Sequence, residues 1–331
     1  MIRLRLLIIS LPLFAMVVAA HSAEAPALRK VNVTIPALTE SSIAFFLAKE
    51  KRYWRDEGLD VELILARAAP SIQAVIAGNV EFGTAGGSAL LPITRGLPMT
   101  FLFATFDRAN FSLYASSQIR AVHELKSKRI GISSFGSGPD SLLRDYLADH
   151  DIDGGRDATI LAVGSGTERF IALKTGAVDA AMLSPSAYML AEAGGFRELV
   201  SFVKQKDYVY LQGGIVARNN LLTSEPALVQ KFIRGTVKAL WYLQSNRPQT
   251  ISALSRVLKI KPNVATRVYD EIRPGVTQDG TVNEEQQKKS LAPFLGRTGA
   301  KDAPPLERAF DFSITRRVLA QLRAEKWRPL P

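Results

Sequence analysis

Segments with strand character alternate with helical segments from residue 31 to residue 202, and the alternation runs through two similar cycles. In a sheet built this way each helix returns the chain to the edge where the previous strand began, so consecutive strands pair in parallel. The pattern predicts strands at 31–35, 59–65, 80–83 and 99–104 in the first cycle, and at 129–133, 159–163, 179–183 and 199–202 in the second. We therefore expect an α/β fold with two largely parallel sheets.

A short signature repeats at the same position in each cycle. Residues 78–81 read Gly-Asn-Val-Glu and residues 176–179 read Gly-Ala-Val-Asp, so both fit the pattern Gly-x-Val-acid. In each case we expect a helix to end on the glycine, which tolerates a left-handed backbone, and to lead directly into a core strand. Four matching residues can arise by chance, but their matching position supports two lobes of related architecture.

Two segments are expected to connect these lobes, at 112–118 and at 208–217, as a hinge of two strands. The chain after residue 219 is mostly helical, and we expect it to pack around the first lobe. Its amphipathic segment 225–245 offers a core-facing stripe of Leu228, Phe232, Val237, Leu240 and Trp241. The expected division is a signal peptide at 1–23, a first lobe at 24–114 with 216–331, and a second lobe at 115–215.

The first residues have the pattern of a secretory signal peptide. Arg3 and Arg5 precede an uncharged run from residue 6 to residue 20, and small residues follow it. The run contains Pro12 and is shorter than the roughly 20 residues of a membrane-spanning helix, although an uncleaved anchor is the alternative reading. We expect the mature protein to be exported.

The composition excludes several kinds of site. The chain has no cysteine, which rules out disulfides, thiolate metal sites and cysteine nucleophiles, and its three histidines leave little for a histidine-rich metal site. Removing the signal peptide takes away two arginines and no acid, so the net charge falls from +11 to +9. The basic residues are scattered and form no nucleic-acid motif. We expect no nucleic-acid partner and no cofactor.

Four segments together resemble the solute-binding proteins of bacterial ABC importers, of the group that binds nitrate, sulfonates, taurine and thiamine precursors. They are AFFLAKEKRYWRDEGLDVE at 44–62, GNVEFGTAGGS at 78–88, LKSKRIG at 125–131 and ALKTGAVDAA at 172–181. The resemblance covers nearly the whole mature chain. It implies a periplasmic-binding-protein type II fold, in which two Rossmann-like lobes are joined by a two-strand hinge and close over a ligand in the cleft between them. It also implies a periplasmic monomer that delivers a small solute to a membrane permease and ATPase.

In open parallel sheets, ligands bind beyond the carboxyl ends of the strands, where loops lead into helices. Glycine and serine at such loops, with the free amides of a helix N-terminus, suit a carboxylate, sulfonate or phosphate, although serines there also serve as ordinary helix caps. The loops provide these candidate ligand contacts: Thr39, Glu40, Ser41, Gly86, Gly87, Ser88, Arg108, Ser134, Gly136, Ser137, Gly138, Ser165 and Ser184. Gly213, in the second connecting segment, completes the set.

Two of these candidates indicate opposite ligand charges. Arg108 would clamp an anion, unless it forms a salt bridge with Asp107 or lies on the surface. Glu40 would accept from a cationic or amine-bearing ligand. The charge of the ligand therefore stays open, while aromatic residues near the loops (Phe45, Phe106, Phe135 and Tyr188) favour an organic ligand.

Two other functions remain as alternatives. The same cleft would serve a sensory protein that presents its ligand to a membrane receptor, and the sequence does not separate that role from import. The resemblance also extends to a thiamine-pyrimidine synthase, but its relatives are intracellular and use a cysteine-rich iron site that this chain lacks. We expect a binding protein and not an enzyme.

Overall fold

The computed structural model describes residues 27–205, 208–298 and 305–330. The expected signal peptide and its cleavage region lie outside these residues, so that prediction is not tested. Within the described part of the chain, no helix is both long and apolar enough to cross a membrane.

The first sheet has the strand order β2-β1-β3-β10-β4. Its strands are β1 (Arg29–Ile35), β2 (Leu59–Leu65), β3 (Phe82–Gly83), β4 (Met99–Arg108) and β10 (Val209–Arg218). β1 pairs in parallel with β2 and β3, whereas β10 runs antiparallel between β3 and β4. This sheet therefore takes four strands from the first cycle and one strand from much later in the chain.

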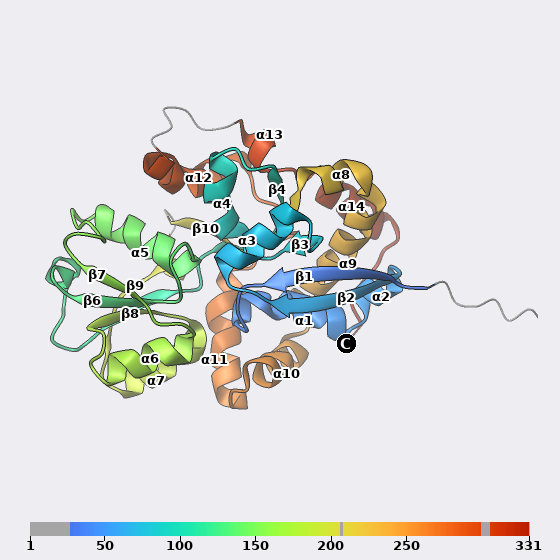
Figure 1. Cartoon of the computed structure of the whole chain (residues 1–331). Coiled ribbons are helices and arrows are strands. Elements are labelled where there is room, and N and C mark those ends of the chain that lie inside the picture. Colours follow the sequence, from blue (N-terminus) through green and yellow to red (C-terminus); the bar gives the residue numbers. More distant parts are fainter. Residues whose placement is uncertain (1–26, 206–207, 299–304, 331) are drawn as a thin grey trace, which may run out of the picture.

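The second sheet repeats the arrangement in the order β7-β6-β8-β5-β9. Its strands are β5 (Ser112–Ala115), β6 (Arg129–Ile132), β7 (Thr159–Ala162), β8 (Ala180–Leu183) and β9 (Arg197–Ser201). β6 pairs in parallel with β7 and β8, and β5 runs antiparallel between β8 and β9. The matching orders confirm the α/β fold with two related sheets, which lie side by side in Figure 1.

The chain changes sheet between Arg108 and Ser112, and again between Ser201 and Val209. These two crossings are neighbours, because Arg108 pairs with Val209 in one sheet and Ser112 pairs with Ser201 in the other. The segments that we expected to connect the lobes therefore form strands after each crossing. Segment 112–118 contains β5 of the second sheet, and segment 208–217 lies largely in β10 of the first. The exact division into lobes stays a proposal.

Gly213 and Gly214, in the second expected connecting segment, lie inside the continuous strand β10. The register of β10 against β4 shifts between Val209 and Gln212 and again between Ile215 and Val216. Glycine inside a strand commonly accompanies such bulges, because the backbone can bend there without a side chain to place. The glycine pair therefore bends the strand without ending it.

Helices cover both sheets (Figure 1). Those inserted between strands are α1 (Ile43–Glu50), α2 (Tyr53–Asp56), α3 (Ala68–Ala77), α4 (Gly86–Thr94), α5 (Gly138–Ala148), α6 (Gly166–Lys174) and α7 (Pro185–Ala193). Those after β10 are α8 (Asn219–Ser224), α9 (Pro226–Ser245), α10 (Arg247–Leu258), α11 (Pro262–Ile272), α12 (Glu284–Thr298), α13 (Leu306–Ala309) and α14 (Ser313–Ala324). Short 3-10 turns are η1 (Glu40–Ser42), η2 (Val122–Leu125), η3 (Phe202–Lys204) and η4 (Arg273–Gly275).

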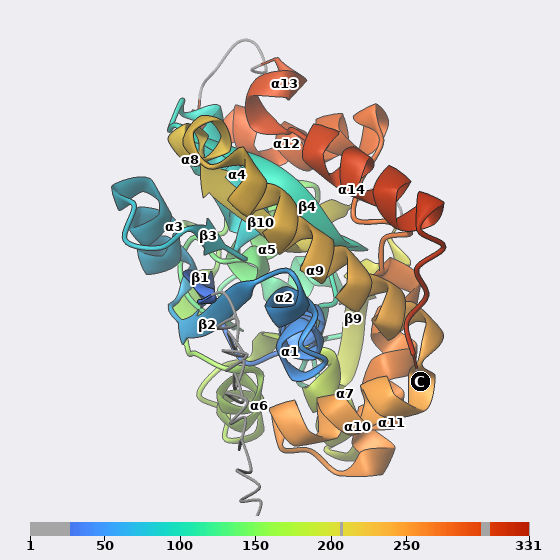
Figure 2. The ribbon, with the colours of Figure 1, turned by 90° about the vertical axis from the view of Figure 1, so that its right-hand side faces the viewer.

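The long helix α9 holds the C-terminal helices against the first sheet (Figure 2). Its predicted apolar stripe is buried in the core at Leu228, Phe232, Val237 and Leu240, and Trp241 packs against that core partly buried. Phe232 stacks on the ring of Phe82 from β3, with centroids 4.0 Å apart. The expectation that the C-terminal helices pack around the first sheet is correct for this helix.

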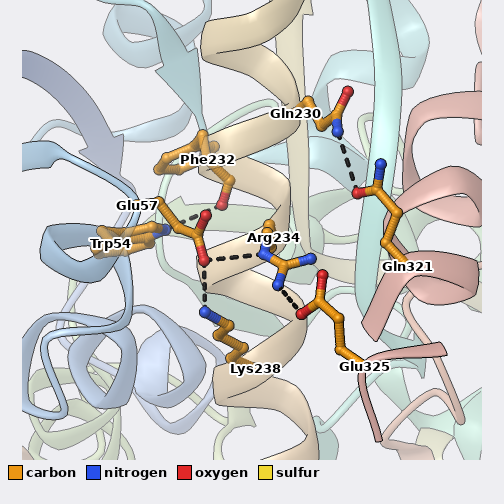
Figure 3. A network of polar contacts seen from close by, with 8 residues as sticks. All are labelled: Trp54, Glu57, Gln230, Phe232, Arg234, Lys238, Gln321 and Glu325. Carbon is orange, nitrogen blue, oxygen red and sulfur yellow. Dashed lines mark hydrogen bonds and ion pairs between the residues drawn. The ribbon is translucent and has the colours of Figure 1, made fainter. Parts of the chain in front are cut away.

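A charged network ties α9 to α2 and α14 (Figure 3). The Glu57 carboxylate accepts a hydrogen bond from Arg234 at 3.0 Å and also contacts the Lys238 ammonium. Arg234 also forms an ion pair with Glu325, whose side chain is half exposed. Lys238 is 7% exposed, so Glu57 supplies the counter-charge that makes its burial tolerable.

Glu57→Ala should lower the free energy of unfolding by about 3 kcal/mol, because the buried Lys238 ammonium loses its counter-charge and keeps only the ring of Trp327 beside it. Glu325→Ala is the matched control and should cost under about 1 kcal/mol, since its ion pair is exposed to solvent. Urea denaturation followed by tryptophan fluorescence measures both. Equal losses in the two variants would contradict this account of the network.

Candidate functional site

A cleft of about 510 Å³ opens where the two sheets face each other. Its lining includes residues that directly follow β1, β2 and β3 of the first sheet and β6, β7 and β8 of the second. β10 contributes Tyr210, Gln212 and Gly213 at the centre. The carboxyl ends of the parallel strands of both sheets thus converge on one cavity, where the topology of open α/β sheets places ligands.

Five helices begin at this cleft. The residues that precede α3, α4, α5, α6 and α7 all line it, and they are Arg67, Ala85, Ser137, Ser165 and Ser184. The first amides of a helix have no partner within the helix, and the helix dipole adds a partial positive charge there. The backbone alone therefore makes the cleft attractive to an anion.

The serines at these helix starts differ in how they use their hydroxyl groups. Ser165 caps α6, because its Oγ accepts from the Glu168 amide at 3.3 Å while the Glu168 carboxylate accepts from the Ser165 amide at 2.6 Å. Ser137 and Ser184 form no such cap and bond other serines, Ser133 at 2.7 Å and Ser186 at 3.3 Å. The capping role thus holds for Ser165, while no side chain caps the first turns of α5 and α7.

Two arginines add charge to the cleft. Arg169 is 3% exposed, and its guanidinium donates to the backbone carbonyls of Met182 and, at 2.6 Å, of Gly164. Burial lowers the pKa of Arg169 to about 10, which leaves it cationic at neutral pH. Arg67 is exposed at the start of α3. An anion in the cleft would therefore meet a buried cation, Arg169 of α6, and an exposed one, Arg67 at the start of α3.

The glycines at the cleft make room for Tyr210 of β10. A Cβ atom on Gly87 would lie 2.5 Å from the Tyr210 ring, and one on Gly138 would lie 2.6 Å from its hydroxyl oxygen. The Tyr210 hydroxyl also lies 3.4 Å from the Ser88 hydroxyl. Tyr210 thus sits between the starts of α4 and α5. These glycines have a packing role in addition to any contact with ligand.

Most of the predicted contacts line the cleft, namely Thr39, Ser41, Gly86, Gly87, Ser88, Ser134, Ser137, Gly138, Ser165, Ser184 and Gly213. Whether they touch ligand stays a prediction. Three predicted contacts lie outside the lining: Glu40, Arg108 and Gly136.

Arg108 and Gly136 each have another local role. Arg108 ends β4 and lies 4.0 Å from Asp107, so the alternative of a salt bridge describes it better than an anion clamp. Gly136 occupies a turn at φ +74°, and its amide donates to the Asp140 carboxylate at 2.8 Å. Both residues were predicted as ligand contacts from their position near a strand end alone. That position does not determine which way a residue points.

Several residues of the lining were not predicted from the sequence. Arg67 lies in the loop that follows β2, so the rule that selected the other loops could have found it, whereas Arg169 lies inside α6 and that rule does not reach it. No sequence pattern indicated the apolar rim of the cleft, because its side chains are far apart in the chain. It consists of Leu38, Leu65, Leu190, Leu258 and Ile260, of which the first three are 52%, 61% and 49% exposed.

Glu40 is fully buried beside the cleft, and neither carboxylate oxygen has a hydrogen-bond partner among the described residues. Burial raises the pKa of Glu40 to about 7, and its own backbone amide and the charge of Arg169 offset only part of that rise. An unpaired buried carboxylate is costly, so ionisation of Glu40 works against folding.

Glu40→Gln should therefore stabilise the protein at pH 8 and have little effect at pH 5. Because the pKa of Glu40 in the folded protein exceeds its ordinary value of 4.5, the wild type loses stability as the pH rises from about 4.5 to about 7. The loss is on the order of 3 kcal/mol. Thermal unfolding across pH 5–8 measures it. The account is wrong if the variant melts at or below the wild-type temperature at pH 8.

Comparisons with known proteins agree on the fold. A binding protein of Brucella abortus (strain 2308) is 27% identical over 255 residues, which cover 72% of this chain and 76% of that protein. A solved structure from Bordetella bronchiseptica RB50 superposes with a TM-score of 0.80 at 20% identity, covering 89% of this chain and 98% of the other. The alkanesulfonate-binding protein SsuA of Xanthomonas axonopodis pv. citri, bound to MOPS, superposes with a TM-score of 0.67 at 21% identity, covering 86% and 96%.

The same fold also occurs in the desulfurization enzyme DSZB, at a TM-score of 0.63 and 15% identity, covering 89% of this chain and 99% of that one. At such identities the likeness shows the fold alone, because one fold can carry binding or catalysis. The family to which the chain belongs is shown by comparison of its sequence with family models. The model of the NMT1/THI5-like family matches residues 39–250, and the chain belongs to that family.

Proposed function

We propose that this protein is the exported solute-binding component of an ABC importer and that it captures a small organic anion. The observation that carries the proposal is the convergence of five helix starts and two arginines on one cleft between the sheets. The two neighbouring crossings form a hinge about which the sheets would close on the solute. The closed form would then deliver it to a membrane permease and ATPase.

The names of related proteins support this role. The Brucella relative is named as a binding protein, and the structural neighbours include periplasmic proteins that bind alkanesulfonate and nitrate. A periplasmic location also agrees with the signal peptide expected at residues 1–23. The proposal keeps the monomer that the resemblance implies, working with membrane subunits.

The rim of the cleft favours an organic anion over nitrate. Leu38 and Leu65 from the first sheet and Leu190 from the second are exposed apolar side chains at the mouth. Nitrate would leave them in water, whereas an organic body would cover them and gain about 25 cal/mol for each Å² of apolar surface buried. The ligand would therefore place its acidic group at the helix starts and its carbon skeleton at the rim.

Thermal unfolding with a panel of solutes tests the proposal. Alkyl and aryl sulfonates and carboxylates should include members that raise the melting temperature by a few degrees, in proportion to ln(1 + [L]/Kd). Choline and glucose, which lack an anionic group, serve as controls and should have no effect. If every organic anion fails while choline or glucose stabilises the protein, the assignment of an anionic solute is wrong.

Arg67→Ala should weaken binding of an anion found in that panel by about tenfold, because it removes one charge-assisted contact. Arg55→Ala is the matched control, since Arg55 is an exposed arginine of α2 that does not line the cleft. Isothermal titration at low and high salt measures both variants. Equal effects of the two substitutions would show that net charge and not the cleft attracts the anion.

A further inference from the structure

The excess positive charge of the chain is confined to its C-terminal part. Residues 209–331 contain 20 lysines and arginines against 10 aspartates and glutamates, whereas residues 24–208 contain 20 against 21. The cleft does not use this excess, because the residues after 208 that line it are all uncharged: Tyr210, Gln212, Gly213, Leu258 and Ile260. Capture of a solute therefore leaves the charge of the C-terminal helices unexplained.

Part of this charge lies on the exposed side of α14. The apolar side of this helix is buried, and it packs on α9 and β4. Arg316, Arg317 and Arg323 are exposed on the helix, which itself contains no aspartate or glutamate. Lys326 and Arg328 are exposed in the segment that follows directly. These five residues form what we term the α14 basic surface.

The cations of the α14 basic surface differ from several others in the C-terminal helices, which have counter-charges. The exposed pairs elsewhere are Arg247 with Asp270, Arg256 with Glu50, Arg267 with Glu192, Lys288 with Glu284 and Lys289 with Glu285. Arg316, Arg317, Lys326 and Arg328 form no ion pair with any residue that the structure describes, and Arg323 lies 3.9 Å from Asp279. The charge of the α14 basic surface is thus largely left for a partner outside the chain.

The composition of this surface favours a charged sheet over a protein as its partner. α14 lies on the outside of the molecule beside α9 (Figure 2). Protein interfaces draw most of their affinity from a few aromatic or apolar anchors. Beyond residue 190 of the described chain, the one exposed large apolar side chain is Leu330, and none lies on α14. An anionic membrane needs no such anchor, since each lysine or arginine near its surface strengthens binding by about fivefold.

We propose that the α14 basic surface binds the anionic phospholipid headgroups of a membrane. The inference goes beyond the proposed function and does not depend on the identity of the solute. No residue of α14 lines the cleft, so lipid and solute would bind at separate places. Attachment to the membrane would raise the effective concentration of the protein near any membrane-embedded partner.

Co-sedimentation of the exported chain with lipid vesicles tests this proposal. The protein should bind vesicles of phosphatidylcholine that contain about 30 mol% phosphatidylglycerol, and it should bind pure phosphatidylcholine much more weakly. Raising the NaCl concentration from about 0.05 M to about 0.5 M should release it, because salt shortens the range of the attraction. Equal binding to both kinds of vesicle, or binding that persists at the higher salt concentration, would contradict an electrostatic contact with the headgroups.

A double variant that carries Arg316→Gln and Arg317→Gln should bind the anionic vesicles about 25-fold more weakly, since two cations are lost. Its melting temperature and its response to solutes should stay those of the wild type, because both side chains are exposed and lie outside the cleft lining. Arg95→Gln combined with Arg120→Gln is the matched control. It removes the same charge from two exposed arginines outside the C-terminal part, and it should weaken binding less than about threefold.

The outcomes separate this inference from the proposed function. If both double variants lose the same affinity, net charge and not the α14 basic surface binds lipid, and the inference is refuted while solute capture stands. If soluble polyglutamate binds the wild type and the anionic vesicles do not, the surface fits an acidic protein and the assignment to lipid is wrong. If the vesicles bind as expected while no organic anion does, the inference stands and the proposed function fails.

Discussion

β5 and β10 each lie in the sheet opposite to the strand that precedes them, and each runs antiparallel between two neighbours. This exchange fixes the two crossings beside each other, with Arg108 against Val209 and Ser112 against Ser201. The carboxyl ends of both sets of parallel strands then face one cavity. The cleft is thus a consequence of topology, and the loops that line it only specify its chemistry.

The chemistry of the cleft has an electrostatic imbalance that topology alone would not produce. Helix starts and arginines on both sides of the cleft supply positive potential, and the buried carboxylate of Glu40 beside them has no hydrogen bond to any of the residues that the structure describes. In a region of low dielectric constant, a buried polar group without a partner costs much free energy. A hydrogen bond to such a group is strong for the same reason. Ionisation of Glu40 therefore lowers the stability of the folded protein.

The elements of the fold were largely predictable because strand-like segments alternate regularly with helical segments along the chain. β6, for example, was expected at 129–133 and spans Arg129–Ile132. The course of the chain at Gly213 and Gly214 was harder to predict, since glycine bends a strand or ends it depending on whether neighbouring strands continue the pairing. The pairing of β10 with β4, a strand more than a hundred residues earlier, decided the matter, and no local pattern contains that information.

The lining residues that follow strand ends were predictable from the sequence. The direction in which each side chain points, and the partner that it meets, were not. Ser137 and Ser165 look alike in the sequence, and each has an acid three residues later. Only Ser165 forms a capping box, with Glu168, whereas Asp140 accepts from the Gly136 amide and from Arg144. Arg108 and Arg169 also look alike, but one pairs with its neighbour at a strand end and the other is buried by the carbonyls of Gly164 and Met182. An arginine that folding has already desolvated and oriented loses little further entropy when an anion arrives, so of the two it is Arg169 that can contribute both affinity and geometry.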